Sequence, residues 1–214
     1  MTCVIVLGPP RCGTSAIAGL LHLLGAHMGD ELMEPMAGVN PKGFYEDMDF
    51  VRMHIKLMHA HYEPRVDFDV VRQPEADDLE AYGRLIAEHS RRSLWGVKDP
   101  KLCFLLPYFL RRYHGLALGV LIDRPLQEAA DSMQPLYGGM TLDKAITLQG
   151  RYRYALEKNL KAWKHRLELR RFDYGRLVEA PFDEACRLAT FCGLSVVNRY
   201  DEIKAFVEAG LKHH

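Results

Sequence analysis

The sequence predicts an α/β fold, a three-layer αβα sandwich with a mainly parallel central sheet. Three short apolar runs lack the period-two alternation of half-exposed strands, as expected of strands buried on both faces, and a fourth strand is expected to join them. Segments with helical spacing of apolar residues separate these runs, which is typical of a parallel sheet covered by helices. A glycine-rich turn joins the first strand to the first helix. Because no linker or repeat interrupts the pattern, we expect a single domain over residues 1–214.

The first half of the chain opens with a predicted strand at 3–7, a run of five apolar residues that Gly-Pro-Pro ends. Apolar residues then recur at helical spacing from Thr14 until Gly25 stops the run. A loop rich in Gly, Pro and Met covers residues 29–43. The helices expected in this half are 14–24, 49–62 and 74–92.

The second half repeats the strand-then-helix order. Two continuous apolar runs, 94–97 and 116–122, each end at a turn that contains aspartate and proline, and a fourth strand is expected near 167–172. The helices expected in this half are 101–113, 125–133, 141–165, 183–192 and 201–209.

Composition and charge exclude several classes of protein. The chain is 48% apolar, and its 28 Lys and Arg residues balance 28 Asp and Glu residues. It is therefore neither disordered nor a general nucleic-acid-binding protein. The longest apolar stretch, 115–122, is far shorter than the roughly 18–20 residues that span a bilayer. The N-terminus lacks the basic region of a signal peptide. Five cysteines without a CxxC pair favour no disulfide framework, no zinc site and a reducing, cytoplasmic location.

The first turn has the features of an anion-binding loop. Gly8 and Gly13 have the spacing of the P-loop pattern GxxxxGK[ST], between a predicted strand and a predicted helix. Glycines let backbone N–H groups converge, and the helix N-terminus adds partial positive charge. However, Thr14 stands at the position of the P-loop lysine, and Arg11 is the only cation in the loop. We therefore expect a phosphate or sulfate site; the alternative is a turn that only reverses the chain.

The segment PRCGTS resembles the 5′-phosphosulfate loop of the sulfotransferases, which use 3′-phosphoadenosine 5′-phosphosulfate (PAPS) and no metal. The resemblance implies that this loop holds the 5′-phosphate. Arg11 would contact the bridging oxygen and assist the departing phosphate. The loop residues so implicated are Pro10, Arg11, Cys12, Gly13, Thr14 and Ser15.

A second anion site is predicted where the third strand ends at Asp123-Arg124-Pro125. Ser132 stands eight residues after Arg124, on the following helix. A turn and two helical turns bring the hydroxyl back toward the carboxyl edge of the sheet, where ligands of open α/β sheets bind. Sulfotransferases hold the 3′-phosphate with an Arg and a Ser at this spacing. Taken alone, each residue could instead lie on the surface, with Arg124 paired to Asp123.

The catalytic base has two candidates. Residues 40–47 resemble the NPxGFxE stretch of many bacterial sulfotransferases, which implicates Glu46. Lys98 matches the lysine that touches the transferred group in the cytosolic branch, but Pro100 stands where that branch has its histidine base. Asp99 is the second candidate. Glu46 could instead be a helix N-terminal acid, and Asp99 a turn or cap residue; Lys98 and Asp99 could also organise the site without moving a proton. We rank Glu46 first.

Other charged residues are assigned to the scaffold. His54, His59 and His61 do not have the four-residue spacing of a helical metal pair, so we expect surface or acceptor-pocket residues and no metal. Segment 151–171 holds eight Lys and Arg residues against two acids. It is a solvated helix face or, alternatively, a patch that attracts an anionic acceptor.

The resemblance extends over nearly the whole chain. Residues 174–181, 191–194 and the ending 206–214 are similar to stretches of bacterial sulfotransferases. The Arg-Lys-Gly segment with which the cytosolic branch also grips the 3′-phosphate is absent from the sequence, so the adenine contacts are unassigned.

The sequence therefore predicts an enzyme that transfers a sulfuryl group from PAPS to a hydroxyl or amine. We expect a small-molecule, glycan or lipid acceptor, no nucleic-acid partner and no membrane span. The acceptor pocket is expected within 29–62 and 64–92. The alternatives are a P-loop kinase of a small metabolite and a catalytically degenerate nucleotide-binding protein.

Overall fold

The centre of the protein is a four-stranded sheet in the order β2-β1-β3-β4, in which all neighbouring strands are parallel. The computed structural model describes residues 1–58, 74–136 and 138–211. The strands are β1 (Thr2–Leu7), β2 (Leu94–Lys98), β3 (Leu116–Asp123) and β4 (Glu168–Asp173). The predicted α/β class and parallel sheet are confirmed.

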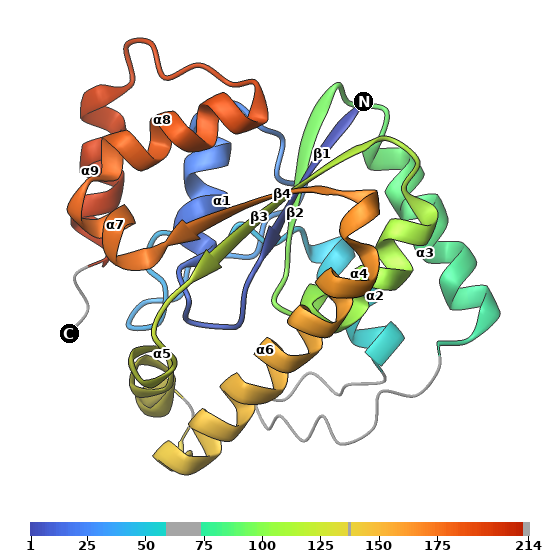
Figure 1. Cartoon of the computed structure of the whole chain (residues 1–214), viewed down its shortest axis with the longest axis horizontal. Coiled ribbons are helices and arrows are strands. Elements are labelled where there is room, and N and C mark those ends of the chain that lie inside the picture. Colours follow the sequence, from blue (N-terminus) through green and yellow to red (C-terminus); the bar gives the residue numbers. More distant parts are fainter. Residues whose placement is uncertain (59–73, 137, 212–214) are drawn as a thin grey trace.

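Helices cover both faces of this sheet (Figure 1). One face carries α1 (Thr14–Leu23), α7 (Tyr174–Glu179), α8 (Pro181–Cys192) and α9 (Tyr200–Leu211). The other carries α2 (Met48–Met58), α3 (Ala76–His89), α4 (Leu102–Arg112) and α6 (Leu142–Trp163). Helix α5 (Leu126–Met133) follows β3 and packs against α6.

Strand β1 shows why its sequence lacks period-two alternation. Cys3, Ile5 and Leu7 enter the core under α2, α3, α4 and α6, whereas Val4 and Val6 enter the core under α1, α8 and α9. Each of these side chains is at most 1% exposed. Burying one Val, Ile or Leu side chain contributes about 1.5–3 kcal/mol, so both cores hold this strand in place.

Strand β4 corrects one expectation. We expected a strand buried on both faces, but residues 168–171 are exposed and only Phe172 is buried. Strand β4 is a terminal strand, paired with β3 alone, and three of its six residues, Glu168, Arg170 and Arg171, carry a charged side chain that favours solvent. Its Arg170 and Arg171 fit this position, because charged side chains on an edge oppose pairing with another chain.

The C-terminal part contains a helix that the sequence analysis missed. Helix α7 begins directly after β4, where the carboxylate of Asp173 accepts a hydrogen bond of 2.9 Å from the backbone N–H of Arg176. Helix α8, expected from 183, begins at Pro181, whose missing N–H costs nothing in the first turn.

The remaining helix bounds differ from expectation by a few residues. Helix α3 is shorter than the predicted 74–92, and α6 passes into a 3₁₀ turn, Lys164–Arg166. The expected extension of α2 to residue 62 lies outside the described residues, as do His59, His61, His213 and His214.

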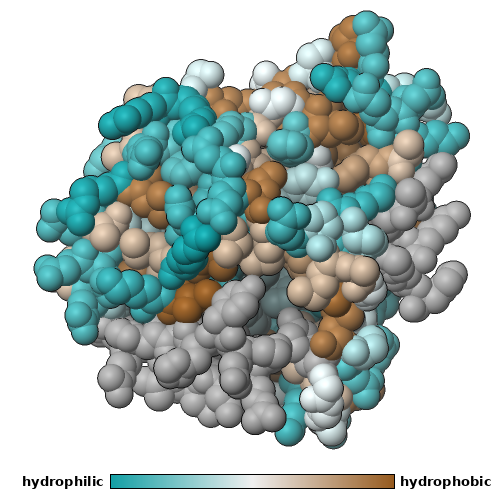
Figure 2. Space-filling model, turned by 180° about the vertical axis from the view of Figure 1, so that it is seen from behind, coloured by the Kyte–Doolittle hydropathy of each residue, from teal (hydrophilic) through white to brown (hydrophobic). Residues whose placement is uncertain are grey.

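The surface is mixed in character. Seen from behind, hydrophobic residues form separate patches among hydrophilic ones (Figure 2). No helix in the described part of the chain has both the length and the apolar character needed to cross a membrane.

The sheet register brings four chain segments to one edge. Val6 is aligned with Lys98, Leu7 with Leu121, and Asp123 with Asp173. The glycine-rich loop, the 99–101 turn, the 124–125 turn and the start of α7 therefore all leave the carboxyl edge. This is the edge at which open α/β sheets bind ligands.

Candidate active site

The loop between β1 and α1 has an unusual backbone. Gly8, Arg11 and Gly13 have φ angles of 155°, 66° and 95°. A left-handed arginine is uncommon, and such residues cluster at functional sites. Gly13 caps α1 without a side-chain hydrogen bond, so no side chain competes for the N–H groups of the first turn. The loop therefore presents a helix N-terminus suited to an anion.

Gly8 and Gly13 are needed because a side chain would clash at both positions, as well as for their positive φ angles. A Cβ on Gly8 would lie 2.9 Å from the carbonyl oxygen of Ile122, and a Cβ on Gly13 would lie 2.5 Å from Cδ2 of Tyr174. The loop thus fits closely against the ends of β3 and β4, and larger residues would displace it.

A pocket opens over this loop and holds about 720 Å³ of empty space, counting the part open to bulk solvent. It is formed by residues 11, 13–16, 39–43 and 45, and by Arg124, Ser132, Tyr174 and Phe206. The described residues that line it include three cations, Arg11, Lys42 and Arg124, and no carboxylate. The three cations would therefore attract an anion.

The structure brings together six of the eight residues predicted to bind the nucleotide. Those that line the pocket are Arg11, Gly13, Thr14, Ser15, Arg124 and Ser132. Pro10 and Cys12 lie in the same loop but contact α6: the Pro10 carbonyl accepts from Gln149, and Cys12 Sγ lies 3.9 Å from Gln149 Oε1. Burial raises the pKa of the Cys12 thiol to about 11, so the thiol is protonated at neutral pH.

Arg11 connects the two predicted anion subsites. Its Nε donates to Ser132 Oγ at 3.2 Å, and its Nη1 donates to the Val39 carbonyl at 3.2 Å. The guanidinium therefore spans from the loop to α5 and to segment 39–45. The predicted proximity of Ser132 to the carboxyl edge is confirmed, although its hydroxyl meets Arg11 rather than Arg124.

Arg124 is held over the loop by several contacts. Its Nη1 donates to the Arg11 carbonyl at 3.3 Å, its Nε lies 3.2 Å from Glu128, and its guanidinium lies 4.3 Å from the ring centre of Tyr174. Its side chain is only 15% exposed. The structure does not support the alternative of a surface arginine whose guanidinium pairs with Asp123: the guanidinium pairs with Glu128, and Asp123 accepts from the backbone N–H of Arg124 and from Arg153.

Lys98 and Glu46 form a buried ion pair beside the loop. Lys98 Nζ binds Glu46 Oε1 and lies 3.2 Å from Ser15 Oγ. Both side chains are less than 9% exposed. Ser15 lines the pocket, so the pair joins it from the side of β2. The carboxylate and ammonium are thus placed together next to the α1 N-terminus.

Asp99 belongs to a separate, fully buried network. Its Oδ2 lies 2.9 Å from His54 Nδ1, and His54 Nε2 lies 2.8 Å from the Tyr82 hydroxyl. The backbone N–H of Lys101 donates to Asp99 Oδ1 at 2.8 Å. Burial acts to raise the pKa of Asp99, but Lys101 and His54 hold it below its ordinary value.

This network corrects the expectation for His54. The sequence analysis placed it on the surface or in an acceptor pocket, but its side chain is 0% exposed and shares the core with Phe50 and Tyr82. The interpretation of Asp99 as a turn residue is supported by its bond to the N–H two residues later. Asp99 does not line the pocket.

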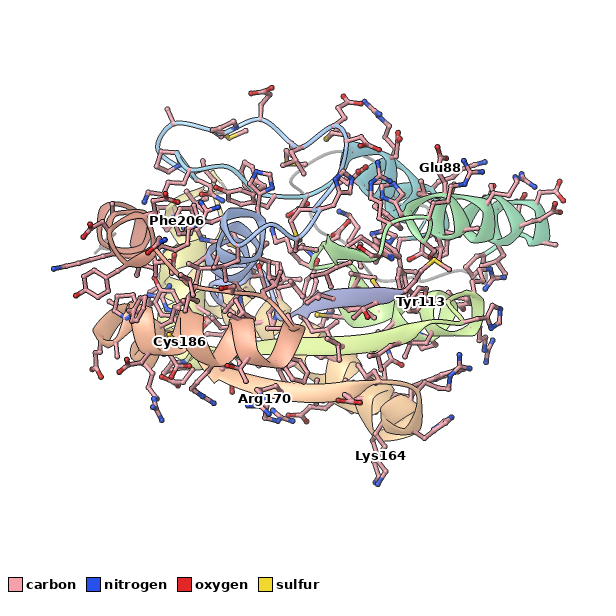
Figure 3. All side chains as sticks on the ribbon, turned by 90° about the horizontal axis from the view of Figure 1, so that it is seen from above. Glu88, Tyr113, Lys164, Arg170, Cys186 and Phe206 are labelled. Atoms are coloured by element: carbon pink, nitrogen blue, oxygen red, sulfur yellow. The ribbon has the colours of Figure 1, made fainter. Side chains whose placement is uncertain are left out.

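The sequence analysis missed the wall formed by α9. Lys42 Nζ binds the carbonyls of Ala205 and Phe206 and lies 4.7 Å from the centre of the Phe206 ring. Phe206 lies between α9 and α1 (Figure 3), edge-on to Tyr45. Segment 39–45 is thereby attached to the C-terminal helix. The motif around Lys42 could not indicate this contact, because Lys42 and Phe206 are more than 160 residues apart in the sequence.

Segment 151–171 is not uniformly solvated. Arg153 turns inward to Asp123 and Arg124, whereas Lys164 and Arg170 project outward on the side away from Phe206 (Figure 3). Within the described residues, no cluster of three or more His, Cys, Asp and Glu side chains could hold a metal ion. All five cysteines are unpaired.

One known structure reproduces the fold, and a second is similar to the chain. The chain is similar to the sulfotransferase domain of the Synechococcus PCC 7002 olefin synthase, with a TM-score of 0.51 and 18% identity over 91% of this chain and 74% of that one. It is also similar to the sulfotransferase domain from the curacin biosynthetic pathway, with a TM-score of 0.48 and 16% identity over 90% and 74%. No family model and no curated protein sequence matches the chain. The protein therefore has the sulfotransferase-type α/β fold.

Proposed function

We propose that the protein is a sulfotransferase that moves a sulfuryl group from PAPS to a hydroxyl or amine of an acceptor. One observation carries the proposal. The Gly13–Ser15 helix N-terminus and the Arg124 and Ser132 side chains line the same pocket, which contains three cations and no carboxylate among the described residues. A ligand with two separated anionic groups matches this arrangement, and PAPS is such a ligand.

The two anionic groups of PAPS would occupy two separate parts of the pocket. The 5′-phosphosulfate would lie against the N–H groups of Gly13, Thr14 and Ser15, where the helix dipole favours negative charge. The 3′-phosphate would lie at Arg124 and Ser132, an arginine and a hydroxyl that both suit phosphate oxygens. Thr14 in place of the P-loop lysine argues against a magnesium-nucleotide hydrolase or kinase.

The proposed transfer step is a substitution at sulfur. The acceptor oxygen or nitrogen forms a bond to sulfur, the bond from sulfur to the bridging phosphate oxygen breaks, and the electron pair leaves with 3′-phosphoadenosine 5′-phosphate. Arg11 and Lys98 stabilise the charge that develops on the departing oxygen. The acceptor proton passes to a carboxylate.

Glu46 is the better base of the two candidates. It shares the loop side of β2 with Lys98, and Lys98 contacts Ser15 in the pocket wall. Neither carboxylate lines the pocket, but Asp99 is bound in the His54 network, away from the loop, and its lowered pKa makes it a weak proton acceptor. We therefore assign proton transfer to Glu46 and a structural role to Asp99. We further propose a cytoplasmic location, which the five unpaired cysteines support.

Calorimetric titration tests the nucleotide class. We expect tight, magnesium-independent binding of 3′-phosphoadenosine 5′-phosphate and much weaker binding of adenosine 5′-monophosphate. A preference for Mg-ATP would replace the proposal with a metabolite kinase. If the 3′-phosphate binds but a broad panel of hydroxyl and amine acceptors gives no turnover, the protein is a degenerate nucleotide-binding member of the fold.

Arg124→Ala should weaken binding of 3′-phosphoadenosine 5′-phosphate by about 2–3 kcal/mol, the size of a lost charge-assisted contact. Binding of adenosine 5′-monophosphate should change little, because it lacks the group that Arg124 holds. Arg84→Ala is the matched control, since Arg84 is 67% exposed on α3 and pairs with Glu80, away from the pocket. Equal affinities for Arg124→Ala and the wild type would remove Arg124 from the site.

A further inference from the structure

A buried amide on α6 contacts the glycine-rich loop on both sides of Arg11. Gln149 is 0% exposed. Its Nε2 donates to the Pro10 carbonyl at 2.7 Å, and its Oε1 lies 3.9 Å from Cys12 Sγ. A buried amide is costly unless its hydrogen bonds are made. Ala145, Leu148 and Tyr152 on the same helix are buried too, and an apolar residue at position 149 would avoid the cost of burying an amide. We therefore attribute the glutamine to its contacts with the glycine-rich loop.

The loop conformation at this point needs external support. Arg11 has a φ of 66°, which a non-glycine residue keeps only when its surroundings impose it. Gln149 binds the residue before Arg11 and contacts the residue after it. It therefore helps to fix the backbone that aims the Arg11 guanidinium at Ser132.

One turn further along α6, Arg153 contacts the second subsite. Its Nη1 donates to Asp123 Oδ1 at 2.6 Å, and its Nη2 binds the Arg124 carbonyl and lies 3.6 Å from Cys12 Sγ. Residues 149 and 153 are four apart and lie on the same face of the helix. One helix face thus binds the loop after β1 and the turn after β3.

We infer that Gln149 and Arg153 are positioning residues that hold the two anion subsites at a fixed separation. This inference rests on the proposed function, in which one nucleotide occupies both subsites. A rigid separation lets the 3′- and 5′-phosphates bind together without reordering the loop. It therefore increases the advantage of a bisphosphate over a monophosphate.

Gln149→Met tests the inference, because methionine has a similar length and volume and lacks the amide. The dissociation constant of adenosine 5′-monophosphate divided by that of 3′-phosphoadenosine 5′-phosphate measures the preference for the bisphosphate. We expect this ratio to be about tenfold lower in Gln149→Met than in the wild type. Asn159→Leu is the matched control on the same helix, since Asn159 donates to the Cys103 carbonyl at 2.8 Å, away from the pocket. It should lower Tm and leave the ratio unchanged. A wild-type ratio in Gln149→Met would overturn the inference.

Hydrogen exchange of the ligand-free protein separates this inference from the proposed function. The backbone amides of residues 11–15 should exchange faster in Gln149→Met than in the wild type, with β1 and β3 unchanged. If the wild type binds the two nucleotides equally well, the proposed function fails. The exchange rate of the loop amides then decides by itself whether Gln149 positions the loop. Equal exchange rates in Gln149→Met and the wild type would overturn the inference. If Gln149→Met does not fold, Arg153→Met carries the same two comparisons, because its side chain is partly exposed.

Discussion

Glu46→Gln should reduce turnover by about 10²–10⁴-fold, the usual contribution of a positioned general base. The amide keeps the size of the side chain and an oxygen that can accept from Lys98, but it cannot take the acceptor proton. Affinity for 3′-phosphoadenosine 5′-phosphate should change little, because Glu46 is not one of the residues expected to hold either phosphate. Donor consumption with an acceptor from the hydroxyl and amine panel measures turnover, and calorimetry measures affinity.

Glu31→Gln provides the control for that substitution. Glu31 precedes Glu46 in the same loop region, but it is exposed and pairs with Arg52 at 3.0 Å. The same chemical change there should leave turnover near that of the wild type. An active Glu46→Gln enzyme would show that proton transfer occurs elsewhere, and the base would have to be sought again beginning with Asp99.

Asp99→Ala should lower the free energy of unfolding by about 3–5 kcal/mol, the cost of removing one partner of a buried ion pair. The substitution leaves His54 Nδ1 and the Lys101 N–H without the acceptor that they share. Denaturant unfolding at pH 7 measures the loss. Glu80→Ala is the control, since Glu80 is 74% exposed in its pair with Arg84 and should contribute less than about 1 kcal/mol.

The stability that Asp99 provides should also depend on pH. Its pKa is lower in the folded protein than in the unfolded chain, where aspartate titrates near 3.9. The stabilisation is therefore complete above about pH 5 and decreases as the pH falls through 3.9 toward the folded pKa. The stability difference between wild type and Asp99→Ala should narrow in acid. A difference that is constant from pH 7 to pH 3 would mean that the charge of Asp99 contributes nothing.

Features that depend on contiguous residues could be predicted well. The turn from Gly8 to Ser15 has its strand, glycines and helix start in one segment, so local rules are sufficient to place it. Arg124 and Ser132 were paired through a spacing of eight residues and do share the pocket. In each case the covalent chain itself limits how far apart the residues can lie.

Features that depend on packing could not be predicted. Gln149 contacts Pro10 across 139 positions, and His54 binds Asp99 across 45. Neither residue type indicates its partner, because a glutamine or histidine on a helix has the same local pattern whether it faces solvent or a distant loop. The charged residues Glu168, Arg170 and Arg171 do indicate the exposure of β4, but its place at the end of the sheet could not be predicted. Edge position is a property of the sheet order and not of the strand.

The sequence by itself determined the α/β class, the parallel sheet and the glycine-rich turn between the first strand and the first helix. Hydrophobic periodicity and the special φ angles of glycine act over a few residues, and their effect is independent of the rest of the chain. The tertiary structure decided which charges share the pocket, which carboxylate lies beside Lys98 and which is buried with His54. Burial and ion pairing depend on the neighbours that folding supplies, and the same Asp or Glu is a base or a scaffold residue according to those neighbours.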